Sequence, residues 1–344
     1  MSLAPLAALA IAAVLAWLLM PLGVRVAWTV GMVDHPAGRK IHAQTTAVLG
    51  GAVVFVSAVL AWALTLLLIP HSRADWEAWY LLAGAAVTLG LGLWDDRFGM
   101  RPSVKMLGQA AAATMLVSAG LVPHIGLPLG IEAAITLVAL IGLMNAVNFL
   151  DNMNGMVGGL AAIALLGFAW TSLERGANGV AAAQLAIAGA CLGFLPHNFP
   201  RARIFLGDAG SLFLGYSLGA SALMTMLGAA PGWGRAGAVL ILAYPAFDMT
   251  FVILTRMRDG RPIYQGGRDH TNHRLASVLQ CPKTTVLVVW ASGAVLCAAG
   301  LSMLHLNRPL PTGLLWGLST ILLLWSGLRL SSVPIAPSPA PPAK

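Results

Sequence analysis

The feature that most constrains this chain is a series of apolar stretches, each long enough to cross a bilayer, that recurs from end to end. A spanning helix needs roughly 20 apolar residues. Of the 344 residues, 58% are hydrophobic and 9% are charged, with a mean hydropathy of +0.81, whereas soluble proteins carry about 25% charged residues. A water-soluble globular protein is therefore excluded. We expect an all-α polytopic membrane protein with about eleven transmembrane helices. The expected spans are residues 3–24, 48–70, 78–94, 104–122, 127–147, 156–173, 180–196, 210–228, 236–255, 284–305 and 312–330.

These spans leave no room for a sizeable soluble domain, so residues 1–331 are expected to form a single transmembrane domain. Residues 1–20 contain no Lys or Arg, which predicts a retained first helix rather than a cleaved signal peptide. The proline-rich residues 332–344 are expected to be a disordered tail. The three cysteines are an odd number and predict free thiols.

The distribution of Lys and Arg predicts the orientation in the membrane. With eleven spans, sixteen of these residues fall on one face, and only Arg73, Arg175, Arg235 and Arg308 fall on the other. Because cytoplasmic loops are enriched in positive charge, we expect the first face to be cytoplasmic and the N-terminus to be outside. The net charge of +8 is mostly this topology signal. It does not predict nucleic-acid binding, because the chain has no compact basic module with interleaved aromatic residues.

Five polar clusters, all on the expected cytoplasmic face, interrupt the apolar pattern. They occupy residues 34–42, 95–105, 145–155, 197–211 and 256–274, whereas the loops of the other face are short. Because these clusters share one face, we expect a composite site there rather than a path across the membrane.

Asp95 and Asp96 directly follow an apolar span. Adjacent carboxylates at a membrane boundary repel each other unless they share a cation or a proton. A divalent metal or phosphate chemistry would account for them, and a solvated helix end is the alternative. Lys105 and Gln109 are four residues apart and would share a helix face. Lys105 would either reach a phosphate or serve as a positive-inside anchor.

Asn145 and Asn148 are three residues apart at the end of a span, with Asp151 beside them and Asn152 on the same face if the helix continues. Asparagines in membrane helices need partners. They therefore predict either hydrogen bonds between helices or a polar pocket for a sugar or nucleotide.

The segment GDAGS, which contains Asp208, opens the eighth span. Its backbone N–H groups would favour a phosphate, and Asp208 would be either an N-cap or a Mg²⁺ ligand. Further on, His270, His273 and Arg274 form a group that suits phosphate better than zinc, because no third zinc ligand is nearby. For the intramembrane Asp248 we expect a structural role.

In this order the clusters resemble the polyprenyl-phosphate N-acetylhexosamine-1-phosphate transferase family over about residues 30–275. The matching motifs are DD…K…Q, NxxNxxDGxDG, NxxP…GDxGS, HxHHR and RKxH. The resemblance implies transfer of a sugar 1-phosphate from a UDP-sugar to undecaprenyl or another polyprenyl phosphate, with release of UMP, in the inner (plasma) membrane. It assigns catalysis to Asp95, Asp96 and Asp151, the metal to Asp208, and substrate binding to Arg39, Lys40, Lys105, Asn145, Asn148, Asn198, His270, His273 and Arg274.

Two positions depart from the family pattern: Asn154 replaces the second acid of DGxDG, and Asn272 replaces the second His of HxHHR. The donor sugar is therefore less specified than the reaction, with UDP-N-acetylglucosamine favoured. The alternative donor is the muramoyl-pentapeptide nucleotide of peptidoglycan synthesis, disfavoured because its transferases carry an uninterrupted His run. A secondary transporter and a catalytically silent homologue are further alternatives.

The mechanism that the resemblance implies is a phosphoryl transfer to the lipid phosphate, with Mg²⁺, or Mn²⁺ in its place, on Asp208. His270, His273 and Arg274 would offset the negative charge of the donor pyrophosphate. A direct attack and a covalent aspartyl intermediate on Asp95 or Asp151 both stay open. Membrane lipids are expected partners, and a homodimer is left open.

Overall fold

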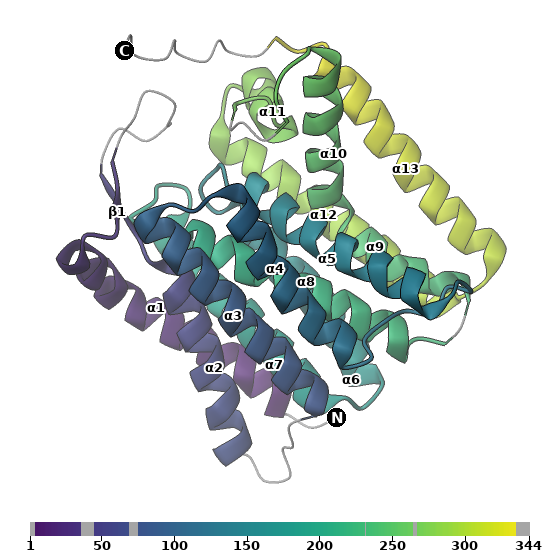
Figure 1. Ribbon diagram of the computed structural model, residues 1–344, viewed down its shortest axis with the longest axis horizontal. Coiled ribbons are helices and arrows are strands. Elements are labelled where there is room, and N and C mark those ends of the chain that lie inside the picture. Colours follow the sequence, from purple (N-terminus) through teal and green to yellow (C-terminus); the bar gives the residue numbers. More distant parts are fainter. Residues whose placement is uncertain (1–3, 36–44, 69–74, 231, 264–266, 335–344) are drawn as a thin grey trace.

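The computed structural model describes residues 4–35, 45–68, 75–230, 232–263 and 267–334. Within these ranges the chain is a helical bundle with one small sheet (Figure 1). The helices of its first half are α1 (Ala4–Val30), α2 (Gly50–Leu68), α3 (Trp76–Phe98), α4 (Pro102–Ser118), α5 (Leu129–Leu150) and α6 (Met156–Glu174). The second half contains α7 (Asn178–Asn198), α8 (Gly207–Gly228), the 3₁₀ turn Trp233–Arg235, α9 (Ala236–Ile241), α10 (Ala243–Arg258), α11 (Thr271–Leu279), α12 (Pro282–Leu306) and α13 (Pro309–Ser331).

The all-α polytopic class is confirmed. In the described residues nine helices are long and apolar enough to cross a membrane, or ten if the bent pair α9–α10 is one span. The remaining expected span coincides with α4, whose 17 residues give a length of about 26 Å, somewhat short of the roughly 30 Å hydrocarbon core. The count of eleven and the orientation therefore stay predictions.

The expected span 236–255 is a broken pair of helices. The axes of α9 and α10 differ by 70° at Leu242. Pro245, in the first turn of α10, has no N–H to donate, and its ring would clash with the carbonyl of Ile241 in a continuous helix. As a result α10 stands above the main bundle, close to α11 and to the end of α13 (Figure 1).

The core is formed by α6, α7 and α8, which are almost wholly buried. Glycines let neighbouring backbones approach the first turn of α8. A Cβ at Gly92 of α3 would lie 2.4 Å from Cα of Ala209, and one at Gly51 of α2 would lie 2.2 Å from N of Gly210. Such small-residue contacts are typical of membrane helices, where close van der Waals packing holds helices together. They fix the N-terminus of α8 between α2 and α3.

A three-stranded sheet, not predicted from the sequence, lies at the same end of the bundle. It consists of β1 (Val33–Asp34), β2 (Thr46–Val48) and β3 (Ile204–Phe205), in the order β1-β2-β3. β1 is antiparallel to β2, and β2 is parallel to β3. The sheet brings Asp34 and Phe205, from opposite halves of the chain, to one place.

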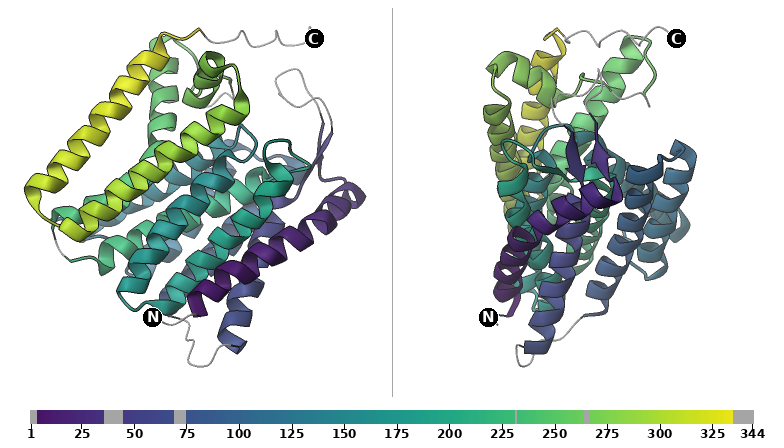
Figure 2. Two further views of the ribbon diagram at one scale, coloured as in Figure 1. Left: turned by 180° about the vertical axis from the view of Figure 1, so that it is seen from behind. Right: turned by 90° about the vertical axis from the view of Figure 1, so that its left-hand side faces the viewer.

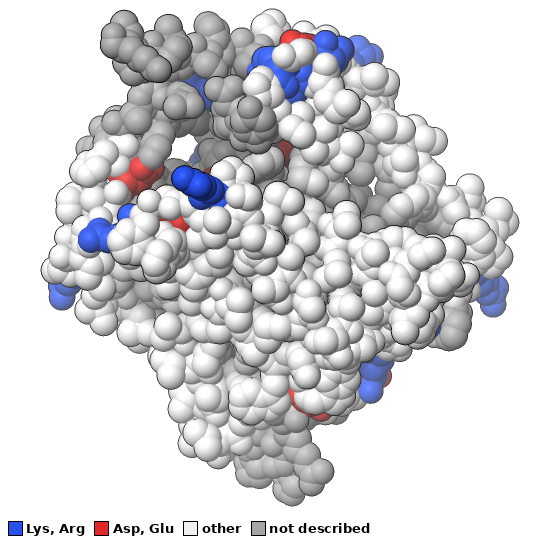
Figure 3. All heavy atoms as spheres, in the orientation of Figure 1, with Lys and Arg blue, Asp and Glu red and all other residues white. Residues whose placement is uncertain are grey.

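The surface agrees with a membrane location. On the face shown in Figure 3, charged side chains form small groups toward the edges and the upper part, and a broad uncharged area crosses the middle. Figure 2 shows α13 at the outer edge of the molecule. Large apolar side chains such as Leu310, Leu318 and Leu328 of α13 are exposed there, as expected for a lipid-facing helix.

Candidate active site

Lys105, in the first turn of α4, is the centre of a polar cluster. Its ammonium Nζ lies 2.9 Å from Oδ2 of Asp95 and 2.6 Å from Oδ2 of Asp208. It also donates to Oδ1 of Asn148 at 3.2 Å. Asn148 in turn donates to Oδ1 of Asp208 at 2.7 Å and to Oγ of Ser211 at 2.8 Å. Four residues that the sequence assigned to the site therefore come together from α3, α4, α5 and α8.

Asp96 holds the N-terminus of α8. Its two carboxylate oxygens accept the backbone N–H groups of Asp208, at 2.8 Å, and Ala209, at 3.0 Å. Gly207, with φ of +74°, permits this contact, because a Cβ there would lie 2.6 Å from Oδ2 of Asp96. The expectation that these N–H groups bind a phosphate is therefore wrong for these two amides, because a carboxylate of the chain itself occupies them.

Asp151 follows the last residue of α5, and its N–H donates to the carbonyl of Asn148 at 3.3 Å. The helix ends at Leu150, so Asn152 does not lie on the same helix face as Asn145 and Asn148. Burial, and to a lesser degree the nearby carboxylates of Asp208 and Asp96, raise the pKa of Asp151 to about 8. This carboxyl group is therefore largely protonated at neutral pH.

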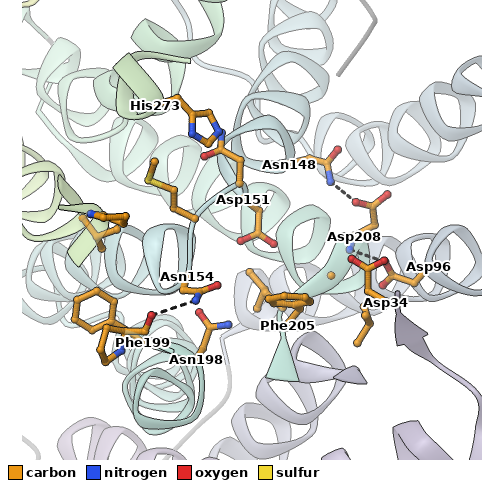
Figure 4. A pocket seen from close by; sticks show the side chains of 18 of the residues that line it. Asp34, Asp96, Asn148, Asp151, Asn154, Asn198, Phe199, Phe205, Asp208 and His273 are labelled. Carbon is orange, nitrogen blue, oxygen red and sulfur yellow. Dashed lines mark hydrogen bonds between the residues drawn. The ribbon is translucent and has the colours of Figure 1, made fainter. Parts of the chain in front are cut away.

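A cavity of about 730 Å³ opens beside the cluster. Figure 4 shows Asp34, Asp96 and Asp208 on one side of it, Asn154, Asn198 and Phe199 on the other, Asp151 between them, and His273 beyond Asp151. The residues that line it are Val33, Asp34, Val48, Asp96, Asn148, Asp151, Asn152, Met153, Asn154, Asn198, Phe199, Pro200, Phe205, Leu206, Gly207, Asp208, Gly267, Arg268, His273, Pro282, Lys283 and Val286.

Two of the predicted substrate-binding asparagines, Asn145 and Asn198, make hydrogen bonds to other parts of the protein. Asn145 donates to Oε1 of Gln109 at 2.7 Å and accepts from Nε2 of the same side chain at 3.3 Å, which joins α5 to α4. Asn145 is absent from the described cavity lining. Asn198 lines the cavity, but its amide also accepts the N–H of Gly155 and donates to the carbonyl of Ile204. The predicted Arg39 and Lys40 lie outside the described residues.

The segment before α11 is anchored to α10. His270 Nδ1 lies 2.7 Å from Oδ2 of the fully buried Asp248, whose Oδ1 accepts the N–H and the hydroxyl of Thr271. The structural role expected for Asp248 thus agrees with its contacts. His273 lines the cavity. Burial, and the nearby His270 to a lesser degree, lower the pKa of His273 to about 4, so its imidazole is neutral at pH 7.

Arg274 is not brought to the cavity. It is 3% exposed and is absent from the described cavity lining. Its guanidinium donates to carbonyl oxygens at the end of α13 instead, for example to that of Val333 at 2.7 Å. The expected contact with donor phosphates is therefore replaced by a contact between helices.

The two positions that depart from the family pattern have defined partners. Asn272 is buried and donates to Oδ1 of Asn152 at 2.6 Å, which links α11 to the turn after α5. Asn154 donates to the carbonyl of Pro200 at 3.1 Å and lines the cavity. At both positions the neutral side-chain amide therefore donates a hydrogen bond to another part of the protein.

Sequence reasoning missed three charged residues of the cavity lining, namely Asp34, Arg268 and Lys283. Asp34 begins the polar segment 34–42 and Arg268 lies in the segment 256–274, so the sequence placed both residues in polar clusters but assigned neither to the site. Lys283 was counted only as a topology signal. Its place in the second position of α12, directly before an apolar span, is typical of a topology signal, so the sequence offered no sign of its role.

The oxygen-rich cluster suits a magnesium ion. No group of three His, Cys, Asp or Glu side chains in the described residues is arranged to hold a metal by itself. Mg²⁺, however, commonly binds through one or two carboxylates together with water and substrate phosphates. Oxygens of Asp95 and Asp208 already converge on one cation, the Lys105 ammonium, and the Asp208 side chain is 34% exposed. The donor set therefore fits this ion.

The fold and site define a multi-pass membrane protein with an acidic cavity at one end of its helices, and comparisons identify its family. Residues 78–226 match the model of glycosyl transferase family 4. A Bacillus subtilis protein named "Probable undecaprenyl-phosphate N-acetylglucosaminyl 1-phosphate transferase" is 31% identical over 81% of this chain and 79% of its own. The Mycobacterium tuberculosis decaprenyl-phosphate N-acetylglucosaminephosphotransferase is 30% identical over 80% of this chain and 77% of its own.

A phospho-N-acetylmuramoyl-pentapeptide-transferase of Desulforudis audaxviator is 29% identical over 78% of this chain and 87% of its own. The chain belongs to the polyprenyl-phosphate N-acetylhexosamine-1-phosphate transferase family, as its motifs predicted. It is therefore a phosphotransferase, and the transporter considered from the sequence receives no support.

Proposed function

We propose that the protein transfers N-acetylglucosamine 1-phosphate from UDP-N-acetylglucosamine to undecaprenyl phosphate or a related polyprenyl phosphate, forming a lipid-linked diphospho-sugar and UMP. The observation that carries the proposal is the cluster of Asp95, Lys105, Asn148 and Asp208 beside a cavity of about 730 Å³. Because the cluster lies at the end of an apolar bundle, a soluble donor and a membrane-held acceptor would both reach it.

The attacking group would be the lipid phosphate itself. A phosphomonoester has a second pKa near about 6 and is largely dianionic at neutral pH, so it needs no general base. The lipid phosphate would attack the sugar-linked phosphorus, and the bond from that phosphorus to the leaving UMP would break. Catalysis of this kind depends on positioning and charge stabilisation.

We favour this direct attack over a covalent aspartyl intermediate. Asp151 is held largely protonated by burial, and a protonated carboxyl group is a poor nucleophile. Asp95 is paired with Lys105 at 2.9 Å and is absent from the described lining of the cavity. Each residue is therefore poorly suited to attack phosphorus.

Asp208 would hold Mg²⁺, or Mn²⁺ in its place, with Asp95 and Asp96 close by. When bound, the ion would neutralise charge on the pyrophosphate oxygens. The chain itself would supply the remaining charge. Arg268 and Lys283, which line the cavity together with the neutral His273, would bind the nucleotide phosphates in place of Arg274.

The donor sugar is proposed from the relatives. Both the Bacillus and the Mycobacterium proteins carry N-acetylglucosamine in their names. This chain has Asn272 where the muramoyl-pentapeptide enzymes are expected to have an uninterrupted His run. The Asn272 side chain donates to Asn152. We further propose that the site faces the cytoplasm from the inner membrane, because the expected eleven spans would put sixteen of the twenty Lys and Arg residues on the same face as the five polar clusters.

The test is UMP release by the purified full-length protein in detergent with undecaprenyl phosphate. Separate reactions would contain UDP-N-acetylglucosamine, UDP-N-acetylgalactosamine or UDP-N-acetylmuramoyl-pentapeptide. We expect release from the first donor only, its loss in EDTA, and its recovery with added Mg²⁺. Asp208→Asn should abolish turnover while the protein stays folded.

Release from the muramoyl-pentapeptide donor alone would replace the proposed sugar. Folded protein that releases no UMP from any donor would contradict the proposed reaction and would favour a silent homologue. Turnover that resists EDTA, or a fully active Asp208→Asn variant, would overturn the metal assignment.

A further inference from the structure

Arg274 joins α11 to the last turn of α13. Its Nη1 donates to the carbonyl oxygens of Leu330 and Ser331, each at 3.2 Å, and to that of Val333 at 2.7 Å. Its Nε donates to the carbonyl of Asp269 at 3.3 Å. The last carbonyls of a helix have no partner within the helix and carry a partial negative charge, so a cation there is favourable.

The guanidinium is enclosed as well as hydrogen-bonded. Arg274 is 3% exposed, and its guanidinium carbon lies 5.3 Å from the centre of the Phe251 ring of α10. A buried cation is costly unless its donors are paired, and here the carbonyls and the aromatic ring provide the partners. This side chain is therefore committed to the protein and is not directed at a ligand.

α13 is a peripheral helix that packs lightly on α12, on the 3₁₀ turn Trp233–Arg235, on α10 and on α11. Of its residues, only Thr312, Ser319 and Gly327 are buried. An apolar helix gains little by exchanging lipid for protein, so polar contacts and close packing decide where such a helix docks. Figure 1 shows the end of α13 meeting α10 and α11 above the bundle, where Arg274 makes its contacts.

The residue directly before Arg274 is His273, the member of α11 that lines the cavity. The start of α11 is held by Asp248 of α10 through His270 and Thr271. Asn272, the next residue of α11, is linked to Asn152 in the turn after α5. Arg274 adds an attachment to the end of α13, directly after His273. Because a helical turn is rigid, the position of the His273 imidazole depends on these attachments together.

We propose that Arg274 is a positioning residue: by tying α11 to the C-terminal end of α13, it holds His273 in the cavity. The peripheral helix α13 is thereby part of the framework of the active site. The expected effect on turnover rests on the proposed function. The attachment of α11 to α13 by Arg274 does not depend on that function.

The first test is a double-mutant cycle on UMP release at saturating donor and acceptor. His273→Ala and Arg274→Ala should each lower kcat by about tenfold, and the double variant should be no slower than His273→Ala, because both changes act through one side chain. Arg274→Lys should be intermediate, because an ammonium cannot reproduce the planar set of donors. Losses that multiply to about a hundredfold in the double variant would show an independent role for Arg274 and overturn the proposal.

The second test does not need a substrate. Hydrogen exchange of residues 271–279 and of the last turn of α13 should be faster in Arg274→Ala and Arg274→Lys than in the unmodified protein. Arg258→Ala is the matched control, since Arg258 is an exposed cation of α10 paired only with Asp259 among the described residues; it should leave exchange unchanged. Unaltered exchange in both Arg274 variants would refute the tie, whether or not the protein releases UMP, and absence of UMP from the unmodified protein would instead refute the proposed function.

Discussion

The Lys105 ammonium lies 2.6 Å from Oδ2 of Asp208, a residue 103 positions away in the sequence. The pair joins the first turn of α4 to the first turn of α8, and the same ammonium also contacts Asp95 at 2.9 Å. One lysine therefore compensates two carboxylates at the place where the proposed phosphate chemistry would occur. Without it, the two acids would face each other with no cation among the described side chains.

We expect Lys105→Met to lower UMP release by about two orders of magnitude, because a charge that is preorganised toward the reacting phosphate is lost. Lys105→Arg should retain part of the activity, since it keeps the charge but spreads it over a planar group. Arg101→Gln, which removes an exposed cation at the start of the same helix, is the matched control. If Lys105→Met kept more than half of the control's rate, Lys105 would be only a topology anchor.

Asn145 and Asn148 lie one turn apart on α5, and the structure gives them different tasks. Asn145 pairs with Gln109, whereas Asn148 contacts Asp208 and Ser211. Asn145→Ala should lower the free energy of unfolding by about 1 kcal/mol, as expected for a hydrogen bond between membrane helices, with UMP release within about threefold of normal. Asn148→Ala should lower UMP release by at least tenfold. Denaturation curves and rates of UMP release would be measured for both variants. If Asn145→Ala were inactive but normally stable, Asn145 would be a substrate-binding residue and not a structural one.

Much of this architecture could be predicted because it follows from apolar runs. A helix in lipid must be long and apolar along its whole length, so every expected span except 236–255 coincides with one observed helix along most of its length. Alternation of the spans also places Asp95, Asn148 and Asp208 at one end of the bundle, and the structure brings them together. The kink before Pro245 and the strands Val33–Asp34 and Ile204–Phe205 were missed, because two-residue strands leave no periodic pattern.

The hydrogen-bond partners of individual polar side chains could not be predicted from the sequence. Spacing puts Gln109 and Asn145 on helix faces, but only the packing of α4 on α5 shows that they bind each other. The motif HxHHR groups His273 with Arg274, yet neighbours on a helix point in different directions. His273 accordingly lines the cavity, and Arg274 contacts α13. Lys283 looked like any positive residue next to a span.

Lys283 lines the cavity without an ion-pair partner in the described part of the chain. If it binds a donor phosphate, Lys283→Gln should raise the KM for UDP-N-acetylglucosamine by about tenfold, as expected for loss of a charge-assisted contact, and should leave the KM for undecaprenyl phosphate within about twofold. Steady-state rates with each substrate varied in turn would measure both values. Arg101→Gln should change neither, and an equal rise in both KM values for Lys283→Gln would point to a general electrostatic effect.

Asp269 makes the attachment of α11 sensitive to acid. Burial opposes ionisation of its carboxyl group, but hydrogen bonds and charge from Arg256, at 2.7 and 2.8 Å, together with the charge of Arg261, hold the pKa of Asp269 at about 2. Because this pKa lies below the ordinary value of 3.8, the ionised carboxylate stabilises the native state above about pH 4, and the contribution is lost as the pH falls toward 2. We therefore expect hydrogen-exchange protection of α11, corrected for the intrinsic rate, to fall between pH 5 and pH 2.5. Asp269→Asn should be less protected than the unmodified protein at pH 5 and should lose this pH dependence. If the variant showed the same decrease with pH, the acid sensitivity would belong to another carboxyl group.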